Sequence, residues 1–584
     1  MHFKFLLPLL LYTFFVLPIY SQQQPNVILI LTDDQGYGDL GINGNPYIKT
    51  PHLDALAKES IRFNQFYVTP VCAPTRSSLI TGRYSLRTGV RDTNNGGAQM
   101  ASSEITIAEI LRDAGYHTGA FGKWHLGDNY PMRPSDQGFQ KSVIHQGGGM
   151  GQPGDHANYY RKDSSYFDPI LWDNNKAKSY QGYCSDIFTT QAISFIEEHK
   201  NKPFFCYLAF NAPHTPLQVP DKYYQMYKDV DVSLGWPDSV QIRRPMTEKD
   251  KEDARKVYGM VTNIDDNVKR VLDKLKELNI EGETIVIFMT DNGPQQMRYV
   301  AGMKGLKTTV YNGGVRVPFF LRYPDGFSGN RDIDAPTAHI DVLPTLVELC
   351  GGQLPTDRII DGRSLMPLIN DAKYTWAERP LFFYWSRKYP ELYQNMALQK
   401  GPYKLVAYAD YDARLAEFEL YNIENDPYEK DNIIHSNSSK AADLKEDMTN
   451  IYEELVVSDN LLDGPRIIIG SEHENPVTLN RNDVGGQRNI WRQEEAFGQW
   501  RVSTNAGRYK IKYTFLKPIK EGGSMILEAN SFIHTKKHSK KDRNYIEWMD
   551  IDFPKMDTDL TPFYKSPDGR IILPFTVEIE RLDS

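Results

Sequence analysis

Two apolar segments of this sequence end in clusters of oxygen-bearing side chains. The run NVILILT leads into Asp33 and Asp34, and the run TIVIFMT leads into Asp291 and Asn292. If the two runs are neighbouring strands of an open α/β sheet, the four side chains converge beyond the carboxyl ends of the strands, where such sheets bind ligands. Crowded carboxylates require a neutralising cation, and oxygen ligands suit Ca²⁺ or Mg²⁺. The alternative is that Asp and Asn only form the turns that end the strands.

A third segment places a nucleophile beside a fixed positive charge. It reads VCAPTRSSLITG, from Val71 to Gly82. Pro74 favours the first turn of a helix and Gly82 favours its end, so Cys72 is expected just before the helix N-terminus, where main-chain amides attract an anion. Arg76 lies four positions further on and therefore on the same helix face. The alternative is a buried cysteine without a chemical role, which is usual for a lone cysteine.

These residues belong to a longer series of motifs. The pattern Cys72-x-Pro74-x-Arg76, followed by SSLITG, resembles the signature of the type I (formylglycine-dependent) sulfatases, whose fold is alkaline-phosphatase-like. Other segments resemble the family pattern in the same order, between residue 26 and about residue 435. They are GKWH (122–125), APH (212–214), DNG (291–293), GLK (305–307), GGVRVP (313–318), ELYN (419–422) and DP (426–427).

The resemblance implies that Cys72 is oxidised to formylglycine by a maturation enzyme. The hydrated aldehyde is a geminal diol, which can expel sulfate by collapsing back to the aldehyde, whereas a serine sulfate ester would need attack by water. By the roles of the family, one Ca²⁺ ion would be held by Asp33, Asp34, Asp291 and Asn292, with the diol at position 72 as a further ligand. The metal would lower the pKa of the hydroxyl group and polarise a sulfate oxygen.

The same resemblance assigns roles to five basic residues. Lys123 would bind sulfate oxygens, and His125 would take the second diol proton. An extended backbone would place these two side chains on one face. His214 and Lys307 would lie near the leaving oxygen, with His214 as the candidate general acid. Arg76 would orient the diol and offset its charge.

The elements that must position these residues alternate along the first part of the chain. Apolar runs without polar alternation, typical of strands buried on both faces, lie at 26–32, 116–122, 203–210, 283–290 and 315–323. Helical patterns lie between them: one begins at Thr106 with a capping box to Glu109, and others span 252–278 and 339–352. This alternation predicts an α/β fold with a mostly parallel central sheet flanked by helices.

The pattern changes after about residue 361. Hairpin-like segments and a polar helix at 440–456 indicate a smaller subdomain with an antiparallel sheet, and strand-like segments without helical periodicity follow from about residue 459. We therefore predict four parts: a signal peptide (1–21), a catalytic α/β domain (22–360), a C-terminal α+β subdomain of the same fold (361–458) and an accessory β-rich domain (459–584). The last part is expected either to cover the catalytic domain as a structural lid, which we favour, or to bind glycan.

The N-terminus and the overall composition indicate an exported globular enzyme. Residues 1–21 combine a short polar start with an apolar core and a candidate cleavage site at Ser21. The alternative is an uncleaved membrane anchor, but we expect a periplasmic or secreted protein without stable membrane insertion. Of 584 residues, 40% are hydrophobic, and the net charge of −8 argues against nucleic acid as a partner. Cysteines 184, 206 and 350 are odd in number and require no disulfide.

The expected reaction is hydrolysis of sulfate monoesters on a carbohydrate. The alternatives are a phosphomonoester or phosphonate hydrolase on the same fold, a general arylsulfatase, and a carbohydrate-binding protein without activity. Export, the 12% aromatic content and the added β domain favour a sulfated polysaccharide of algal type, such as ulvan, carrageenan or fucoidan, or its oligosaccharides. His145, beside three glycines, is a further candidate for substrate contact.

Overall fold

The computed structural model describes residues 24–155, 165–233, 245–488, 490–530, 532–539 and 543–583. The predicted signal peptide at 1–21 lies outside these residues. Within them, no helix combines the length and apolar character needed to cross a bilayer.

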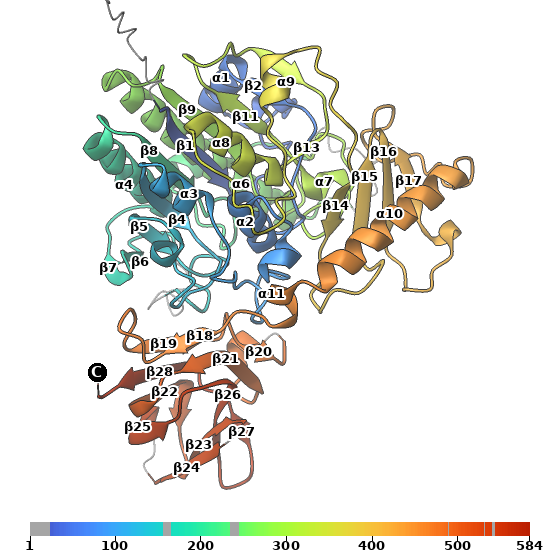
Figure 1. Cartoon of the computed structure of the whole chain (residues 1–584). Coiled ribbons are helices and arrows are strands. Elements are labelled where there is room, and N and C mark those ends of the chain that lie inside the picture. The colour runs from blue at the N-terminus through green and yellow to red at the C-terminus, as the bar shows by residue number, and fades with distance from the viewer. Residues whose placement is uncertain are drawn as a thin grey trace, which may run out of the picture.

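A ten-stranded sheet forms the centre of the larger body (Figure 1). Five parallel strands make up its middle, in the order β9-β1-β8-β4-β5. They are β9 (Thr284–Thr290), β1 (Asn26–Thr32), β8 (Phe204–Ala209), β4 (His117–Lys123) and β5 (Lys141–His145). The expectation of a mostly parallel sheet is confirmed for this middle part.

Both edges of the sheet are mixed, which the sequence did not predict. On one side β11 (Phe319–Arg322) runs antiparallel to β9, and β2 (Ile61–Phe63) and then β12 (Arg331–Ile333) lie beyond it in the sheet. On the other side, β6 (Ile170–Asp173) pairs antiparallel with β5, and β7 (Lys176–Ser179) forms the edge. The single strand expected over 315–323 is wrong, because Pro318 separates two strands in different sheets. The first of them, β10 (Arg316–Val317), joins β3 (Phe66–Tyr67) and β13 (Thr337–Ala338).

Helices cover both faces of the sheet, so alternate residues of β1 enter two different cores. Val27, Leu29 and Leu31 pack with residues of α2, α3 and α8, whereas Ile28 and Ile30 pack with residues of α1, α4 and α6. These helices are α1 (Pro51–Glu59), α2 (Cys72–Thr81), α3 (Ile107–Asp113), α4 (Cys184–His199), α6 (Glu248–Glu277) and α8 (Val342–Cys350). Burial on both faces explains why β1 has no polar alternation.

Capping residues determine where two of the predicted helices begin. Thr106 caps α3 with the expected reciprocal bonds to Glu109. The helix α6 starts at Glu248 rather than at residue 252, because Thr247 and Asp250 form a second capping box. Four further helices in the described residues are short: α5 (Asp221–Tyr224), α7 (Asn312–Val315), α9 (Met366–Asn370) and α11 (Asp459–Leu462).

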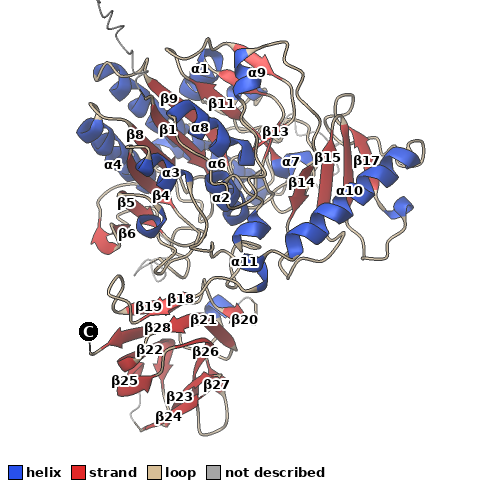
Figure 2. Cartoon of the chain, in the orientation of Figure 1, coloured by secondary structure: helices blue, strands red, loops and turns tan. Residues whose placement is uncertain are grey.

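A four-stranded antiparallel sheet lies beside the larger body, with α10 (Ser438–Val456) along it (Figure 2). Its strands are β14 (Leu381–Tyr384), β15 (Met396–Lys400), β16 (Tyr403–Ala407) and β17 (Glu419–Asn422). Leu398 and Leu405 of the sheet share a core with Leu444 and Met448 of the helix.

The last part of the chain, from β18 onward, consists of two further β sheets, and we call it the tail. Its strands are β18 (Ile467–Ile469), β19 (Val477–Asn480), β20 (Gly485–Gly486), β21 (Gly498–Thr504), β22 (Gly507–Ile519), β23 (Gly523–Ala529), β24 (Phe532–His538), β25 (Arg543–Phe553), β26 (Met556–Lys565), β27 (Ile571–Ile572) and β28 (Thr576–Arg581). The expectation of a β-rich C-terminal part is confirmed.

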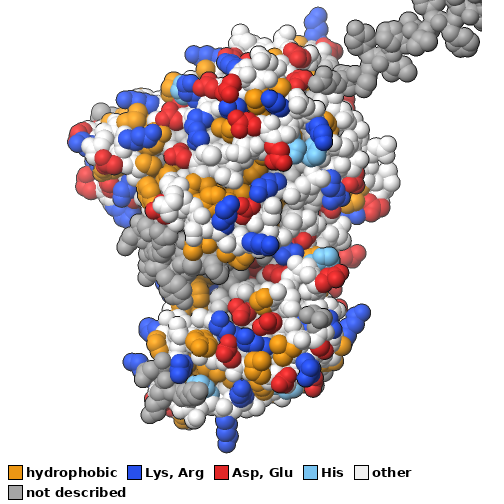
Figure 3. Space-filling view, turned by 90° about the vertical axis from the view of Figure 1, so that its left-hand side faces the viewer, with side chains coloured by type: hydrophobic (Ala, Val, Ile, Leu, Met, Phe, Trp, Pro, Cys, Tyr) orange, Lys and Arg blue, Asp and Glu red, His pale blue; other side chains and the backbone are white. Residues whose placement is uncertain are grey.

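The tail forms a lower body that meets the larger body at a narrower waist (Figure 3). At this joint the Asn480 side chain donates to Asp128 Oδ2 at 2.9 Å, and Glu474 accepts from the main-chain N–H of Tyr130 at 2.6 Å. Asp128 and Asp483 are both buried at the joint. The joint is therefore polar and rich in carboxylates.

Candidate active site

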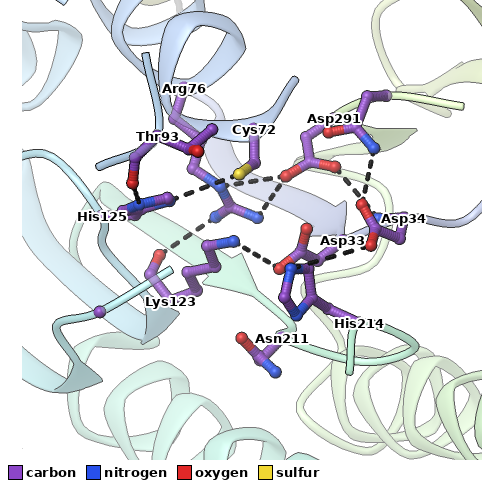
Figure 4. A network of polar contacts seen from close by, with 12 residues as sticks. Asp33, Asp34, Cys72, Arg76, Thr93, Lys123, His125, Asn211, His214 and Asp291 are labelled. Carbon is purple, nitrogen blue, oxygen red and sulfur yellow. Dashed lines mark hydrogen bonds and ion pairs between the residues drawn. The ribbon is translucent and has the colours of Figure 1, made fainter. Parts of the chain in front are cut away.

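The carboxyl ends of four adjacent strands bring the predicted polar residues together. In the parallel pair β1 and β9, Thr32 pairs with Thr290, so Asp33 and Asp291 leave the sheet at the same level. The neighbouring strands β8 and β4 continue the sheet on the other side of β1. The segments after them supply two histidines and a lysine to the same edge (Figure 4). The expected convergence of the two acidic strand ends is therefore present.

Lys123 and His125 reach the site by different backbone routes. Lys123 is the last residue of β4, and its Nζ lies 2.6 Å from Asp33 Oδ2. The extended backbone expected between the two residues is not present, because His125 has a φ of 61°, in the left-handed region. This bend directs the imidazole at Cys72, with 3.4 Å between Nδ1 and Sγ.

Cys72 lies within the first turn of α2 rather than before it. The helix begins at Cys72 and ends before Gly82, whose φ of 68° is left-handed. All ten side chains of the helix are buried. The first main-chain N–H groups of a helix lack intrahelical partners and attract negative charge. A negatively charged group attached at residue 72 would therefore be stabilised by the start of the helix.

The hydrogen bonds of His125 determine its tautomer. Nε2 lies 2.7 Å from the main-chain oxygen of Thr93, which can only accept, so Nε2 carries the proton of the neutral ring. Burial, followed by the charge of Lys123, holds the pKa of His125 well below its usual range. The unprotonated Nδ1 therefore faces Cys72 as a proton acceptor.

Arg76 is fully buried and connects two of the strand ends. Its Nη2 and Nε donate to Asp291 Oδ2 at 2.8 and 3.1 Å, and its Nη1 donates to the main-chain oxygen of Lys123 at 3.2 Å. Burial lowers the pKa of Arg76, but Asp291 and the other acidic groups nearby together raise it above its usual range. The guanidinium group is thus a permanent positive charge beneath Cys72.

Lys307 is brought to the site by a loop that depends on glycine. A Cβ atom on Gly293 would lie 1.9 Å from the main-chain oxygen of Gly313, so only glycine allows the two segments to meet. Lys307 Nζ then donates to Asp34 Oδ1 at 2.5 Å. The two lysines of the site each pair with one of the neighbouring aspartates that follow β1.

His214 faces Asp34 from the segment after β8. Its Nε2 lies 3.8 Å from Asp34 Oδ2, and its Nδ1 lies 2.7 Å from the main-chain oxygen of Thr215. Burial lowers the pKa of His214 to about 3, with Lys307 and Lys123 adding to the effect and Asp34 opposing it. The ring is neutral in the free site, with its proton on Nδ1.

The donor set fits a hard divalent cation. Three groups of His, Cys and carboxylate atoms in the described residues are spaced to hold a metal, and two of them contain Asp33. Asp33 Oδ1, Asp34 Oδ2 and Asn292 Oδ1 are buried without a hydrogen-bond partner, which is costly unless a ligand satisfies them. Burial and the neighbouring Asp33 raise the pKa of Asp291 to about 6. Converging oxygens that lack hydrogen-bond partners match Ca²⁺ better than softer metals.

A cavity of about 640 Å³ opens above Cys72. His125, His214 and Lys307 line its base. Its upper wall comes from three distant stretches of the chain, which the sequence did not connect with the site. These residues are Thr93, Asn94, Asn95, Trp385, Arg387, Arg481, Val484, Gln487, Ile490, Trp491 and Arg492. The segment QRNIWRQ combines aromatic and basic residues, but nothing in its spacing indicated a site.

His145 does not reach this cavity. It is 1% exposed, and its Nδ1 lies 3.4 Å from Asp155 Oδ1. The nearby residues that do line the cavity are Gly148 and Gln152. The expected contact between His145 and substrate is therefore not supported, because β5 ends at His145 and directs the side chain into the protein.

Comparison with known proteins agrees with this geometry. Residues 25–352 match the sulfatase family, and residues 306–456 match the family described as N-sulphoglucosamine sulphohydrolase, C-terminal. The first match spans more than half of the chain, and the chain therefore belongs to the sulfatase family of sulfuric ester hydrolases.

Individual relatives cover most of the chain at moderate identity. N-acetylgalactosamine-6-sulfatase of Sus scrofa is 31% identical over 62% of this chain and 69% of its own length. The ulvan-active sulfatase of Formosa agariphila is 29% identical over 70% of this chain and 77% of its own. Among solved structures, Ps i-CgsB in complex with k-i-k-neocarrahexaose superposes with a TM-score of 0.65 and 28% identity, covering 75% of this chain and 94% of that one.

Proposed function

We propose that the protein hydrolyses sulfate monoesters of carbohydrates through a formylglycine made from Cys72, with one bound Ca²⁺ ion. The observation that carries this proposal is the position of Cys72 Sγ, which lies 3.4 Å from the unprotonated Nδ1 of His125 at the start of a buried helix. Family membership supports the reaction class.

An unmodified Cys72 would be a poor nucleophile. Burial raises the pKa of the thiol, although Lys123 and Lys307 oppose the effect, so the reactive thiolate is scarce near neutral pH. Hydrated formylglycine instead supplies one hydroxyl group to attack sulfur and a second whose loss of a proton expels sulfate. This chemistry requires a proton acceptor at residue 72, and Nδ1 of His125 meets that requirement.

The remaining side chains are assigned either to the sulfate group or to the leaving group. Asp33, Asp34, Asp291 and Asn292 would hold Ca²⁺, which when bound supplies charge neutralisation and polarises a sulfate oxygen. Lys123 would bind sulfate oxygens, and Arg76 would orient residue 72. The arrangement of Asp33, Asp34, Asp291, Lys123 and Arg76 around one centre supports this proposal (Figure 4).

The leaving oxygen is assigned to His214 and Lys307. His214 Nε2 bears no proton in the free site, so it must be charged as the anionic substrate enters before it can act as a general acid. Burial lowers the pKa of Lys307, but the surrounding acidic groups, with Asp34 foremost, together raise it above its usual range. Lys307 therefore remains protonated and can share the negative charge.

The substrate proposed is a sulfated polysaccharide of algal type, such as ulvan, or an oligosaccharide derived from it. Trp385 and Trp491 offer aromatic surface for sugar rings in the cavity wall. The names of the ulvan-active relative and of the carrageenan oligosaccharide complex support the same class. We further propose export through the signal peptide at 1–21, to the periplasm or the medium, and the domain boundaries near residues 360 and 458.

The decisive test is mass spectrometry of the peptide that contains Cys72, from protein made in its native host. Conversion to formylglycine changes the mass of this residue, and matured protein should release sulfate from sulfated glycans. A phosphate monoester serves as the comparison substrate. An unmodified cysteine in active native protein would overturn the mechanism, and faster turnover of the phosphate ester would favour a phosphoesterase instead.

A further inference from the structure

The tail forms part of the wall of the catalytic cavity. Its contribution centres on the helical turn η7 (Ile490–Arg492). Trp491 and Arg492 of this turn line the same cavity as Cys72, although more than 400 residues separate them along the chain. A tail that only stabilised the fold would not need to reach this cavity.

Arg481 fixes the turn in place. Its side chain is 1% exposed, and its guanidinium group donates to the main-chain oxygens of Ile490 and Gln493, both at 2.5 Å, and of Pro574 at 3.0 Å. In return the Trp491 indole donates to the main-chain oxygen of Arg481 at 3.1 Å. The backbone on both sides of Arg492 is thus held by one buried cation, which presents Arg492 on a rigid support.

A buried carboxylate joins this wall to the rest of the protein. Asp92 is fully buried and accepts from Arg488 Nη2 of the tail at 2.8 Å and from the Trp385 indole of the neighbouring subdomain at 3.2 Å. Arg488 also donates to the main-chain oxygen of Arg387. The tail, the subdomain and the catalytic part therefore meet at one edge of the cavity.

Two guanidinium groups at this edge lack anionic partners. Arg387 and Arg492 are exposed, and no carboxylate of the described residues forms an ion pair with either of them. Arg387 lies over the Trp385 ring at 5.3 Å. The lysines of the catalytic site differ, because Lys123 and Lys307 each pair with an aspartate. The cavity mouth thus carries positive charge that the protein does not neutralise.

We propose that Arg387 and Arg492 form a second anion subsite, which binds a sulfate or carboxylate group on the substrate other than the sulfate that is removed. The planar guanidinium group matches either anion with two parallel hydrogen bonds. The substrate is therefore an oligosaccharide with at least two anionic groups, and Trp491 offers a surface for the sugar ring between them. This inference rests on the proposed sulfatase function.

The test compares full-length, matured wild-type protein with Arg492→Ala and Arg387→Ala. Substrates are ulvan, carrageenan and fucoidan oligosaccharides and a small aryl sulfate, which has no second anion. A charge-assisted hydrogen bond contributes about 1.5–3 kcal/mol, so kcat/KM on a susceptible oligosaccharide should fall about 10- to 100-fold, mainly through KM. This loss should exceed the loss on the aryl sulfate at least about tenfold.

Arg508→Ala is the matched control, because Arg508 is an exposed tail arginine that pairs with Asp550 and does not line the cavity. It should behave as wild type on every substrate. Oligosaccharides that differ only in whether the second anion is a sulfate or a uronate identify which anion the subsite prefers. Oligosaccharides that bind without being hydrolysed can be tested as competitive inhibitors of aryl sulfate hydrolysis.

Equal losses on oligosaccharide and aryl sulfate would overturn the subsite, as would an Arg492→Ala variant that retains full activity on the oligosaccharides. The same conclusion would follow if wild type hydrolysed the aryl sulfate but no oligosaccharide was either cleaved or inhibitory. Failure of the proposed function would look different, because matured wild-type protein would then release no sulfate from any substrate.

Discussion

The immediate surroundings of Cys72 combine a proton acceptor with permanent positive charge. His125 approaches from the left-handed bend after β4, and Arg76 lies beneath, held by Asp291. The type and order of these residues could be predicted from sequence. The bend at His125 could not, because a left-handed φ at a residue other than glycine depends on the packed surroundings rather than on local preference.

Cys72→Ala should abolish sulfate release while leaving the fold intact. The substitution removes one sulfur atom from a buried helix position and leaves the helix backbone unchanged, so melting should shift by only a few degrees. Activity and thermal unfolding should be measured on the same sample. Retained turnover would contradict a role for residue 72 as nucleophile.

His214→Ala should impair sugar sulfates more than an activated aryl sulfate. A sugar alkoxide is a poor leaving group and needs a proton, whereas an aryl oxide leaves almost unaided, and positioned general acids contribute about 10²–10⁴-fold. Rates on both substrates, measured for the variant and wild type, give the ratio. Equal losses would assign the proton to another group, of which Lys307 is the nearest candidate.

At the scale of elements, the strand ends act as a preformed frame for a cation. β1 and β9 are in register at Thr32 and Thr290, so their acidic ends converge without any contribution from flexible loops. Removal of the metal should therefore leave the sheet folded but leave several buried oxygens unsatisfied.

Treatment with a chelator should abolish activity and lower the melting temperature, and Ca²⁺ should restore both better than Mg²⁺. The wide, carboxylate-rich donor set favours the larger ion. Differential scanning fluorimetry supplies a readout that does not require the reaction. In Asp33→Ala protein the calcium-dependent rise in melting temperature should disappear, and its persistence would place the ion elsewhere.

The central strands and capped helices are predictable because local sequence determines them. β1 was predicted with its observed bounds, since a run buried on both faces carries no polar residue. The edge strands β6 and β7 were missed, because all their residues except Leu171 are partly or fully exposed. Whether β11 runs parallel or antiparallel depends on the path of the chain between strands, which hydrophobic pattern does not report.

At the scale of the whole molecule, the cavity is the least predictable feature. Its wall combines residues near 93, 385 and 491, and no local signal connects stretches so far apart. The tail was expected either to be a structural lid, which we favour, or to bind glycan, and this choice stays a prediction. Its two cavity residues, Trp491 and Arg492, add a chemical contribution that the sequence pattern did not indicate.

The joint between tail and catalytic part should weaken as pH rises. Burial raises the pKa of Asp483 to about 7, and burial together with the Asp483 charge raises that of Asp128, with Asp155 and Glu474 also facing the pair. A raised pKa means that the folded state binds more protons than the unfolded state between about pH 4 and pH 7, so stability falls across that range.

Asp483→Asn should therefore reduce the dependence of stability on pH. The amide stays neutral at all pH values, and the melting temperature of the variant at pH 8 should exceed that of wild type by about 2–5 °C. Below about pH 4, where the carboxyl group is protonated in both the folded and the unfolded wild-type protein, the two proteins should melt together. An unchanged pH dependence in the variant would show that other groups control the joint.

The burial of α2 also sets an order of events during biosynthesis. Cys72 is 2% exposed, and every side chain of its helix is enclosed by the sheet, the neighbouring helices and the cavity wall. An enzyme that modifies Cys72 must hold the surrounding segment in its own active site, which the folded protein does not permit. If Cys72 is converted to formylglycine as proposed, maturation would have to precede folding, and a chain that folded before it met the maturation enzyme would stay inactive.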